Sequence, residues 1–167
     1  MKERLAAADP ARAGPVPHVR AIRSTASTST GAAAAELMPL VIVLIRRKQG
    51  VDYPVLVPNR KGLDAAIAAG CDEVVVFGAA TEAFSKRNTN CSIDEGLARF
   101  SEVCSEALAK GLRVRGDVSV CLGCPYEGDV KPAQVTRVAR ELYAMGCYEI
   151  TIADTIGSGT PAQTRAV

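Results

Sequence analysis

From residue 53 onward, apolar and polar positions repeat one pattern: a short β-branched run, a polar loop, an amphipathic segment and a glycine. The short runs predict strands, and segments with apolar residues three and four apart predict helices. Strands are predicted at 53–57, 73–77, 113–120 and 148–153. Gly70, Gly111 and Gly146 close successive units that lie 41 and 35 residues apart. Each interval holds one strand, one helix and two connections.

The predicted helices carry their own start signals. A short helix is predicted at 63–69, whereas residues 78–88 are predicted to form a loop. Ser92 and Glu95 have the spacing of a capping box, and the apolar residues that follow them fall on one helical face. Pro132 opens the next helix, and Thr160 with Pro161 has the pattern that opens a last one.

This repeat predicts an α/β fold with parallel strands. Such strands form either an open doubly wound sheet or a closed barrel, and periodicity alone does not separate the two. A complete (β/α)8 barrel takes ~250 residues, so about four β/α units make roughly half of one. Ligands bind at the carboxyl ends of the strands in both architectures. We therefore expect Asn59, Gly78, Leu122 and Asp154 to lie on one rim.

Residues 1–44 differ in composition from residues 45–167, because they are rich in Ala, Pro, Ser and Thr and contain few large aliphatic side chains. Such a segment buries too little apolar surface to offset its ordering entropy. We expect a low-complexity tail that is disordered or out of frame, of which residues 1–36 are poorly ordered or make few contacts with the folded part. The spaced arginines are also typical of a transit peptide, but Glu3, Asp9 and Glu36 argue against that interpretation.

Charge, hydropathy and cysteine content exclude several classes of protein. The net charge is +2 with basic and acidic residues interspersed, which gives no electrostatic support for a nucleic-acid partner. The apolar run 37–45 contains Pro39 and is far shorter than the ~20 residues of a membrane span. Six cysteines without a secretory signal predict a reduced, cytoplasmic protein. Cys121 and Cys124 have zinc-like spacing, but no second cysteine pair completes such a site.

Asp154 is the most informative polar residue, because it directly follows an apolar strand and precedes the glycine-rich turn 155–159. A carboxylate at this place either serves chemistry, as a base or a ligand of a cation or hydroxyl, or caps the backbone of the turn. Glu127 is a second rim carboxylate or a solvated loop acid. Cys124 is a nucleophile or, with no histidine near it in the sequence, a small buried thiol.

The basic pair Lys86 and Arg87 follows the second predicted strand. It suits the phosphates of a carrier such as coenzyme A, and a solvated basic pair is the equal alternative. The sequence contains neither G-x-x-x-x-G-K-[ST] nor G-x-G-x-x-G, so nucleotide-binding enzymes with those phosphate cradles lose support.

Six segments together resemble the 3-hydroxy-3-methylglutaryl-CoA lyase family and occur in that family's order. They are P-V-L-V-P-N at 54–59, V-F-G-A-A-T-E-A-F-S-K-R-N at 76–88, N-C-S-I-D-E at 90–95, L-G-C-P-Y-E-G at 122–128, L-Y-A-M-G-C-Y-E-I at 142–150 and D-T-I-G-S-G-T-P at 154–161. One such string is weak evidence, whereas six in register are strong.

The resemblance implies part of a (β/α)8 barrel that cleaves 3-hydroxy-3-methylglutaryl-CoA to acetyl-CoA and acetoacetate, in the cytoplasm or, in a eukaryote, the mitochondrial matrix. It implies an acyl-CoA substrate, a homo-oligomeric complete enzyme and a divalent cation, Mg²⁺ or Mn²⁺. Asp154 matches an active-site aspartate of the family pattern. The residues expected at the substrate are Asn59, Ser85, Lys86, Asn88, Cys124 and Glu127.

Other family motifs do not occur in the 167 residues. The resemblance implies an R-D-G-L-Q strand with a catalytic arginine and a metal-binding aspartate, and later a His-x-His motif, a catalytic cysteine and a metal-binding asparagine. The cation ligands are therefore missing from this chain, which we expect to be inactive alone. The composition of residues 1–44 suggests a frameshifted or mis-started reading as a hypothesis.

Two alternatives stay open at this point. One is a Claisen-type synthase of the same superfamily, which condenses acetyl-CoA with a 2-oxo acid. The other is a noncatalytic β/α domain that only binds an acyl-CoA.

Overall fold

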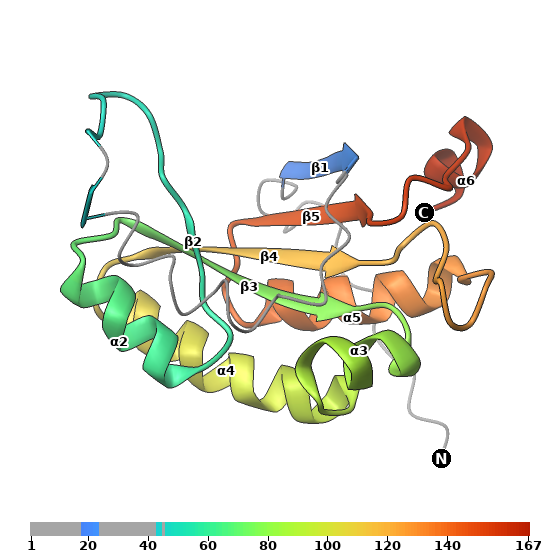
Figure 1. The fold of residues 1–167 in the computed structure, drawn as a ribbon, viewed down its shortest axis with the longest axis horizontal. Coiled ribbons are helices and arrows are strands. Elements are labelled where there is room, and N and C mark those ends of the chain that lie inside the picture. The colour runs from blue at the N-terminus through green and yellow to red at the C-terminus, as the bar shows by residue number, and fades with distance from the viewer. Residues whose placement is uncertain (1–17, 24–42, 45) are drawn as a thin grey trace, which may run out of the picture.

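The computed structural model describes residues 18–23, 43–44 and 46–167. They form one five-stranded sheet in the order β1-β5-β4-β3-β2 (Figure 1). The elements are β1 (His18–Arg23), β2 (Val55–Leu56), α2 (Arg60–Ala68), β3 (Glu73–Ala79), α3 (Glu82–Thr89), α4 (Ile93–Ala109), β4 (Arg113–Ser119), α5 (Pro132–Ala144), β5 (Glu149–Asp154) and α6 (Pro161–Ala166).

The strands from β2 to β5 lie parallel and adjacent in chain order, as the repeat predicted. Gly78 pairs with Val118, and Val118 pairs with Ile152. Because the strands are parallel, their carboxyl ends meet at one edge of the sheet, where the arrowheads point in Figure 1. The predicted α/β class and the common rim are confirmed.

β1 was not predicted. It pairs in parallel with β5, from His18 opposite Glu149 to Arg23 opposite Asp154. The expectation that this part of the chain makes few contacts was wrong for residues 18–23. An edge strand presents unpaired backbone N–H and C=O groups that another extended segment can satisfy, and β-branched Val19 and Ile22 suit a strand. The other residues of 1–42 lie outside the described residues.

Helix α3 corrects a second expectation, because it occupies part of the segment 78–88 predicted as a loop. Its N-cap residue Thr81 makes no side-chain cap hydrogen bond, so the usual local start signal is missing. Asn90 ends the helix in a left-handed conformation with φ of 55°. At β2, only Val55 and Leu56 form the strand, since Pro54 has no N–H to donate.

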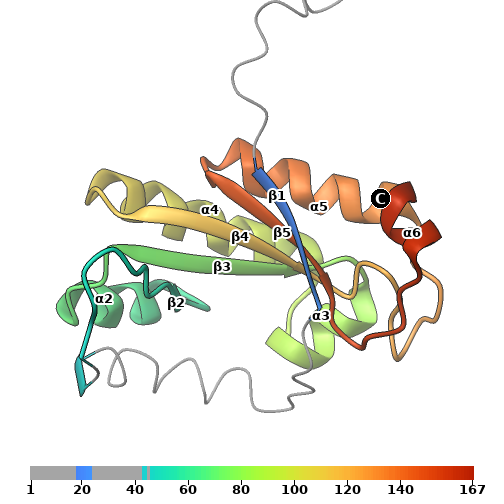
Figure 2. The same cartoon turned by 90° about the horizontal axis from the view of Figure 1, so that it is seen from above.

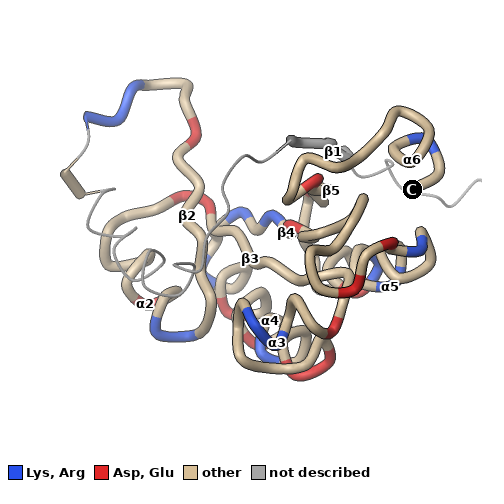
Figure 3. Tube along the Cα trace, turned by 45° about the vertical axis from the view of Figure 1, so that its right-hand side comes forward, with Lys and Arg blue, Asp and Glu red and all other residues tan. Residues whose placement is uncertain are grey.

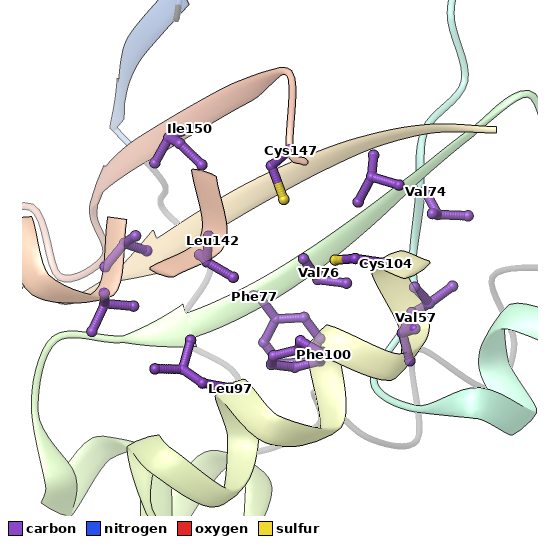
Figure 4. Packing of buried hydrophobic residues seen from close by; sticks show 14 of the residues in the cluster. Val57, Val74, Val76, Phe77, Leu97, Phe100, Cys104, Leu142, Cys147 and Ile150 are labelled. Atoms are coloured by element: carbon purple, nitrogen blue, oxygen red, sulfur yellow. The ribbon is translucent and has the colours of Figure 1, made fainter. Parts of the chain in front are cut away.

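Helices α2, α4 and α5 cover one face of the sheet (Figures 1 and 2). The sheet approaches them closely at glycines: a Cβ on Gly116 would lie 3.1 Å from Leu142 Cβ on α5. Phe77 of β3 packs against Phe100 of α4 with ring centroids 5.6 Å apart. Figure 4 shows this core, in which the sulfurs of Cys104 and Cys147 point toward each other.

The start and stop signals of the longer helices are confirmed. Ser92 and Glu95 form the predicted capping box of α4, and Gly111 follows it with φ of 79°. Thr160 caps α6, which begins at Pro161. The positions of these helix ends determine where the loops that enter and leave the rim begin and end.

At the amino ends of the strands, Glu73, Arg113 and Tyr148 form an ionic and aromatic clamp. Buried Glu73 accepts a hydrogen bond from the Tyr148 hydroxyl at 2.8 Å and pairs with Arg113. Arg113 also pairs with Asp52 at 2.8 Å, and its guanidinium lies 5.2 Å from the centroid of the Tyr148 ring. Burial, with Glu73 adding to it, raises the pKa of Tyr148 to about 12. Groups at the amino ends of barrel strands serve stability, which suits this clamp.

Basic and acidic positions are interspersed over the described chain in Figure 3. None of the described helices is both long and apolar enough to span a membrane.

Candidate functional site

The loops after β2, β3, β4 and β5 meet at the carboxyl edge of the sheet and form the rim. Backbone hydrogen bonds connect them across the strands: Ala80 N–H donates to Ser119 O at 3.0 Å, and Cys121 N–H donates to Ala153 O at 3.1 Å. The rim is therefore one continuous surface built from neighbouring loops.

Asp154 lies buried at the end of β5, and its carboxylate closes the following turn. Oδ1 accepts from Ser158 N–H at 3.1 Å, and Oδ2 accepts from Gly159 N–H at 2.9 Å. The turn-capping role considered from the sequence is thus present. An ionised carboxylate has about four acceptor positions, so these two bonds leave capacity for a hydrogen bond from a ligand.

The β4 loop begins with an unusual backbone conformation. Val120 is fully buried and has φ of 55°, a left-handed value that is rare for a β-branched residue. Its N–H donates to Thr155 Oγ1 at 2.7 Å. Sequence reasoning missed this contact, because a valine in a strand-like run gives no signal of a left-handed turn.

The β4 loop then reaches across to α3. The Thr81 hydroxyl donates to buried Cys124 Sγ at 3.1 Å, and Ala83 N–H at the start of α3 donates to Glu127 Oε1 at 2.7 Å. Glu127 thus supplies the helix cap that Thr81 does not, with a carboxylate at the positive end of the helix. Tyr126 packs beside Phe84 and under the Arg87 guanidinium, 4.5 Å from the ring centroid.

The other predicted site residues lie on the rim in different environments. Asn59 caps α2 by accepting from Gly62 N–H at 3.0 Å. Lys86 is exposed on α3. Ser85 is buried and Asn88 half-buried, and both line a small pocket of about 10 Å³ between β3, α3 and α4. That volume suits one water molecule and not an acyl group. The structure brings Cys124 and Glu127 together with α3, while Asn59 stands apart at the β2 end.

The β4 and β5 loops pack tightly against each other. A Cβ on Gly123 would lie 2.5 Å from Ser158 Oγ, and one on Gly159 would lie 2.4 Å from Leu122 Cδ1. Leu122 O also accepts from Gln163 Nε2 of α6 at 3.5 Å. A side chain at Gly123 would displace the Ser158 side chain, and one at Gly159 would displace the Leu122 side chain.

A polar cluster on the sheet face opposite the helices was also missed. It consists of Arg115, Asp117, Glu149 and Thr151, which occupy alternate positions of neighbouring strands. Arg115 Nε and Asp117 Oδ1 form an ion pair at 3.4 Å, but one buried polar atom in each of the four residues makes no hydrogen bond within the described part of the chain. Burial raises the pKa of Asp117, against the effects of Thr151 and Arg115. The alternating sequence R-V-R-G-D-V-S of β4 could have indicated this polar face.

The surroundings of Cys121 and Cys147 keep these two cysteines in the thiol form. All six are free and buried. Burial raises the pKa of the Cys121 thiol to about 12, and the Cys104 thiol together with burial raises the pKa of Cys147. A thiolate is the nucleophilic form, so Cys121 and Cys147 are poor nucleophiles.

The described residues do not assemble a cation site. Within them, no group of three or more His, Cys, Asp or Glu side chains is placed to hold a metal ion. Asp154 would be a single ligand, and its oxygens already accept from backbone N–H groups. The residues present do not fit a divalent cation by themselves.

Comparisons with known proteins agree on one family. The model of the HMGL-like family matches residues 26–167, starting upstream of the tail boundary placed at residue 44. Over 121 residues the chain is 60% identical to the mitochondrial hydroxymethylglutaryl-CoA lyase of Bos taurus, covering 72% of this chain and 37% of that protein. It is 59% identical over 116 residues to a cytoplasmic 3-hydroxy-3-methylglutaryl-CoA lyase of Danio rerio, covering 70% and 35%.

Solved structures give the same result. A hydroxymethylglutaryl-CoA lyase from Pseudomonas aeruginosa is 54% identical with a TM-score of 0.71, covering 80% of this chain and 43% of that one. An HMG-CoA lyase from Acinetobacter baumannii, solved with coenzyme A and 3-methylmalate, is 25% identical with a TM-score of 0.75, covering 83% and 45%. The chain thus spans well under half the length of these relatives.

Proposed function

The chain belongs to the HMGL-like family, and on that premise we propose that it is part of a hydroxymethylglutaryl-CoA lyase, a carbon–carbon lyase with a (β/α)8-barrel fold. The substrate is 3-hydroxy-3-methylglutaryl-CoA, and the products are acetyl-CoA and acetoacetate. The observation that carries this proposal is 60% identity over 121 residues, and the family model matches residues 26–167, which include the loops that form the rim.

The chemistry requires a group that accepts the proton of the tertiary hydroxyl. Loss of that proton lets a C=O form while the neighbouring C–C bond breaks, and the electron pair passes to the acetyl thioester, whose carbon then takes up a proton. No other reactant is consumed. A residue on the rim contributes by accepting, holding or returning this proton.

Asp154 is our candidate for a direct contact with the hydroxyl. It is buried at the rim, and its two backbone bonds fix the carboxylate in one orientation. A carboxylate fixed in this way is already oriented to accept the proton of the hydroxyl. The same two bonds thus cap the turn and prepare the group for this role.

Two observations support the proposed substrate class: the basic residues on the rim and the ligands of one relative. The Acinetobacter baumannii structure contains coenzyme A and 3-methylmalate, a carrier and a hydroxy acid related to the proposed substrate. On this chain, Lys86 and Arg87 give α3 two basic side chains in its last turn, which suit the phosphates of coenzyme A. Cys124 and Glu127 contact the start of α3, Ser85 and Asn88 line the small pocket between α3 and α4, and Asn59 lies at the neighbouring strand end.

We also propose that the complete enzyme needs a divalent cation, Mg²⁺ or Mn²⁺, and forms a homo-oligomer in the cytoplasm. The relatives include both cytoplasmic and mitochondrial enzymes. The cation would supply charge stabilisation at the substrate oxygens. Its ligands would come from outside the described residues, so we assign no reaction step to it here.

An exchange enzyme tests the activity. Residues 46–167 of this chain replace the matching segment of the Pseudomonas aeruginosa lyase, and the parent enzyme is the control. Incubation with 3-hydroxy-3-methylglutaryl-CoA and Mg²⁺ should release acetyl-CoA and acetoacetate. A folded exchange enzyme that instead condenses acetyl-CoA with 2-oxo acids would make this a synthase segment. One that binds acyl-CoA without any turnover would make it a binding domain.

A further inference from the structure

Val120 holds a strained conformation at the point where β4 enters the rim. Its φ of 55° places a β-branched residue in the left-handed region, a conformation that is unfavourable and persists only where the surroundings impose it. Residues in such conformations gather at functional sites.

Three contacts on both sides of Val120 impose the conformation. Its N–H donates to Thr155 Oγ1 at 2.7 Å. The next N–H, of Cys121, donates to Ala153 O at 3.1 Å, and the Cys121 thiol donates to Val118 O at 3.0 Å. Of these three contacts, only the one with Thr155 joins the side chain of another residue to the N–H of Val120 itself.

The position of Thr155 in the chain means that this contact couples two parts of the rim. Thr155 follows Asp154 directly and begins the turn that the Asp154 carboxylate closes. On the other side, the chain turns at Val120 and continues to Cys124. The Cys124 Sγ accepts a hydrogen bond from the Thr81 hydroxyl of the β3 loop. One hydroxyl therefore joins the turn that orients Asp154 to the loop that spans the rim.

We propose that Thr155 is a positioning residue, which holds Val120 in its left-handed conformation and so fixes the β4 loop relative to Asp154. The catalytic part of this inference rests on the proposed lyase function. Thr155 acts through Val120 and the β4 loop and need not touch the substrate. The effect is on the geometry of the rim, where misplacement of about 1 Å lowers rates on the order of 10²-fold.

The hydrogen bond from Val120 N–H to Thr155 Oγ1, called the latch from this point on, is tested on the full 167-residue chain without any assay of activity. Thr155→Val keeps the shape of the side chain and removes the hydroxyl. Amide hydrogen exchange at Val120 should speed up roughly 10-fold or more in Thr155→Val, because its acceptor is lost, and should stay near the original rate in Thr155→Ser. The matched control is Thr136→Val on α5, whose hydroxyl donates to Pro132 O at 2.9 Å. Unchanged exchange at Val120 in Thr155→Val would overturn the latch.

The positioning role is tested in the exchange enzyme. Thr155→Val should lower kcat roughly 10-fold or more with less than about 3-fold change in KM, and Thr155→Ser should restore most of kcat. A purely structural role would lower melting temperature and leave kcat of the folded enzyme unchanged, which would overturn the proposal. If the unsubstituted exchange enzyme does not cleave the substrate, the lyase function and the positioning role both fall, and faster exchange at Val120 would show that the latch remains.

Discussion

At the scale of single residues, Asp154 caps its turn, and the catalytic role that we propose for it is the one that the sequence presented as the alternative. The carboxylate caps its turn through Ser158 and Gly159, and it matches the aspartate expected at the substrate. Both roles fit one geometry, since two bonds to backbone N–H groups orient the group and leave acceptor capacity.

Asp154→Asn in the exchange enzyme should lower kcat by roughly 10²-fold or more, because an amide does not accept a proton as a carboxylate does. One oxygen acceptor remains for the turn, so the enzyme should still fold. Steady-state kinetics with 3-hydroxy-3-methylglutaryl-CoA measures the effect, and circular dichroism checks the fold. A near-normal kcat would leave Asp154 as a turn cap only.

Asp117 should make stability depend on pH. Its pKa is raised by burial, and Glu149 adds to the rise. The unfolded carboxyl titrates near pH 4, so its stability contribution is full below that pH and is lost as pH rises through the raised folded pKa. The facing groups are Arg115, Glu149 and Thr151.

Asp117→Asn should therefore stabilise the chain relative to the original at pH 7–8, and this advantage should shrink as the pH falls to about 4. Urea unfolding across this range gives the difference in free energy of unfolding at each pH. A difference that does not vary with pH, or that grows toward acid, would show that Asp117 is well solvated or well paired when ionised.

The sequence predicted which residues lie on the rim, but it did not predict which residues they bond to. The strand ends fixed where Asn59, Cys124, Glu127 and Asp154 lie, because parallel strands bring their carboxyl ends together. The bond from Ala83 to Glu127 and the latch from Val120 to Thr155 join residues 44 and 35 positions apart in sequence. Local propensity contains no information on such pairs, so they required the three-dimensional structure.

At the scale of elements, predictions succeeded where local signals were strong and failed where tertiary contacts decided. The capping box of α4 is formed by its own residues. In contrast, α3 begins against Glu127 from another loop, and β1 forms only by pairing with β5. Short elements stabilised by distant partners are the ones that the sequence pattern missed.

Two glycines on neighbouring elements should respond to alanine in opposite directions. A Cβ on Gly116 in β4 would lie 3.0 Å from Ile150 Cδ1 and 3.1 Å from Leu142 Cβ, so Gly116→Ala should destabilise the fold by about 1–3 kcal/mol. On Gly96 in α4 the nearest atom would be Cys91 Sγ at an ordinary 3.6 Å, so Gly96→Ala should stabilise it by about 0.5–1 kcal/mol. Chemical denaturation of both variants measures this, and equal destabilisation would contradict the close packing of β4 on α5.

At the scale of the whole molecule, the chain forms a parallel sheet covered by helices on one face and spans 37% of the length of the Bos taurus relative. Within its described part, carboxylates and thiols do not gather into a cation site. The rim therefore contains positioning groups and one proposed proton acceptor. Members of a catalytic set that act together lose nearly all activity when several are removed.

Acetoacetate formation by the purified 167-residue chain, supplied with 3-hydroxy-3-methylglutaryl-CoA and Mg²⁺ or Mn²⁺, tests this account most directly. We predict no measurable cleavage by the chain alone, under conditions in which the exchange enzyme turns over. Metal-dependent cleavage by the chain itself, lost in Asp154→Asn, would contradict the account, because it would show that these residues already form a complete catalytic site.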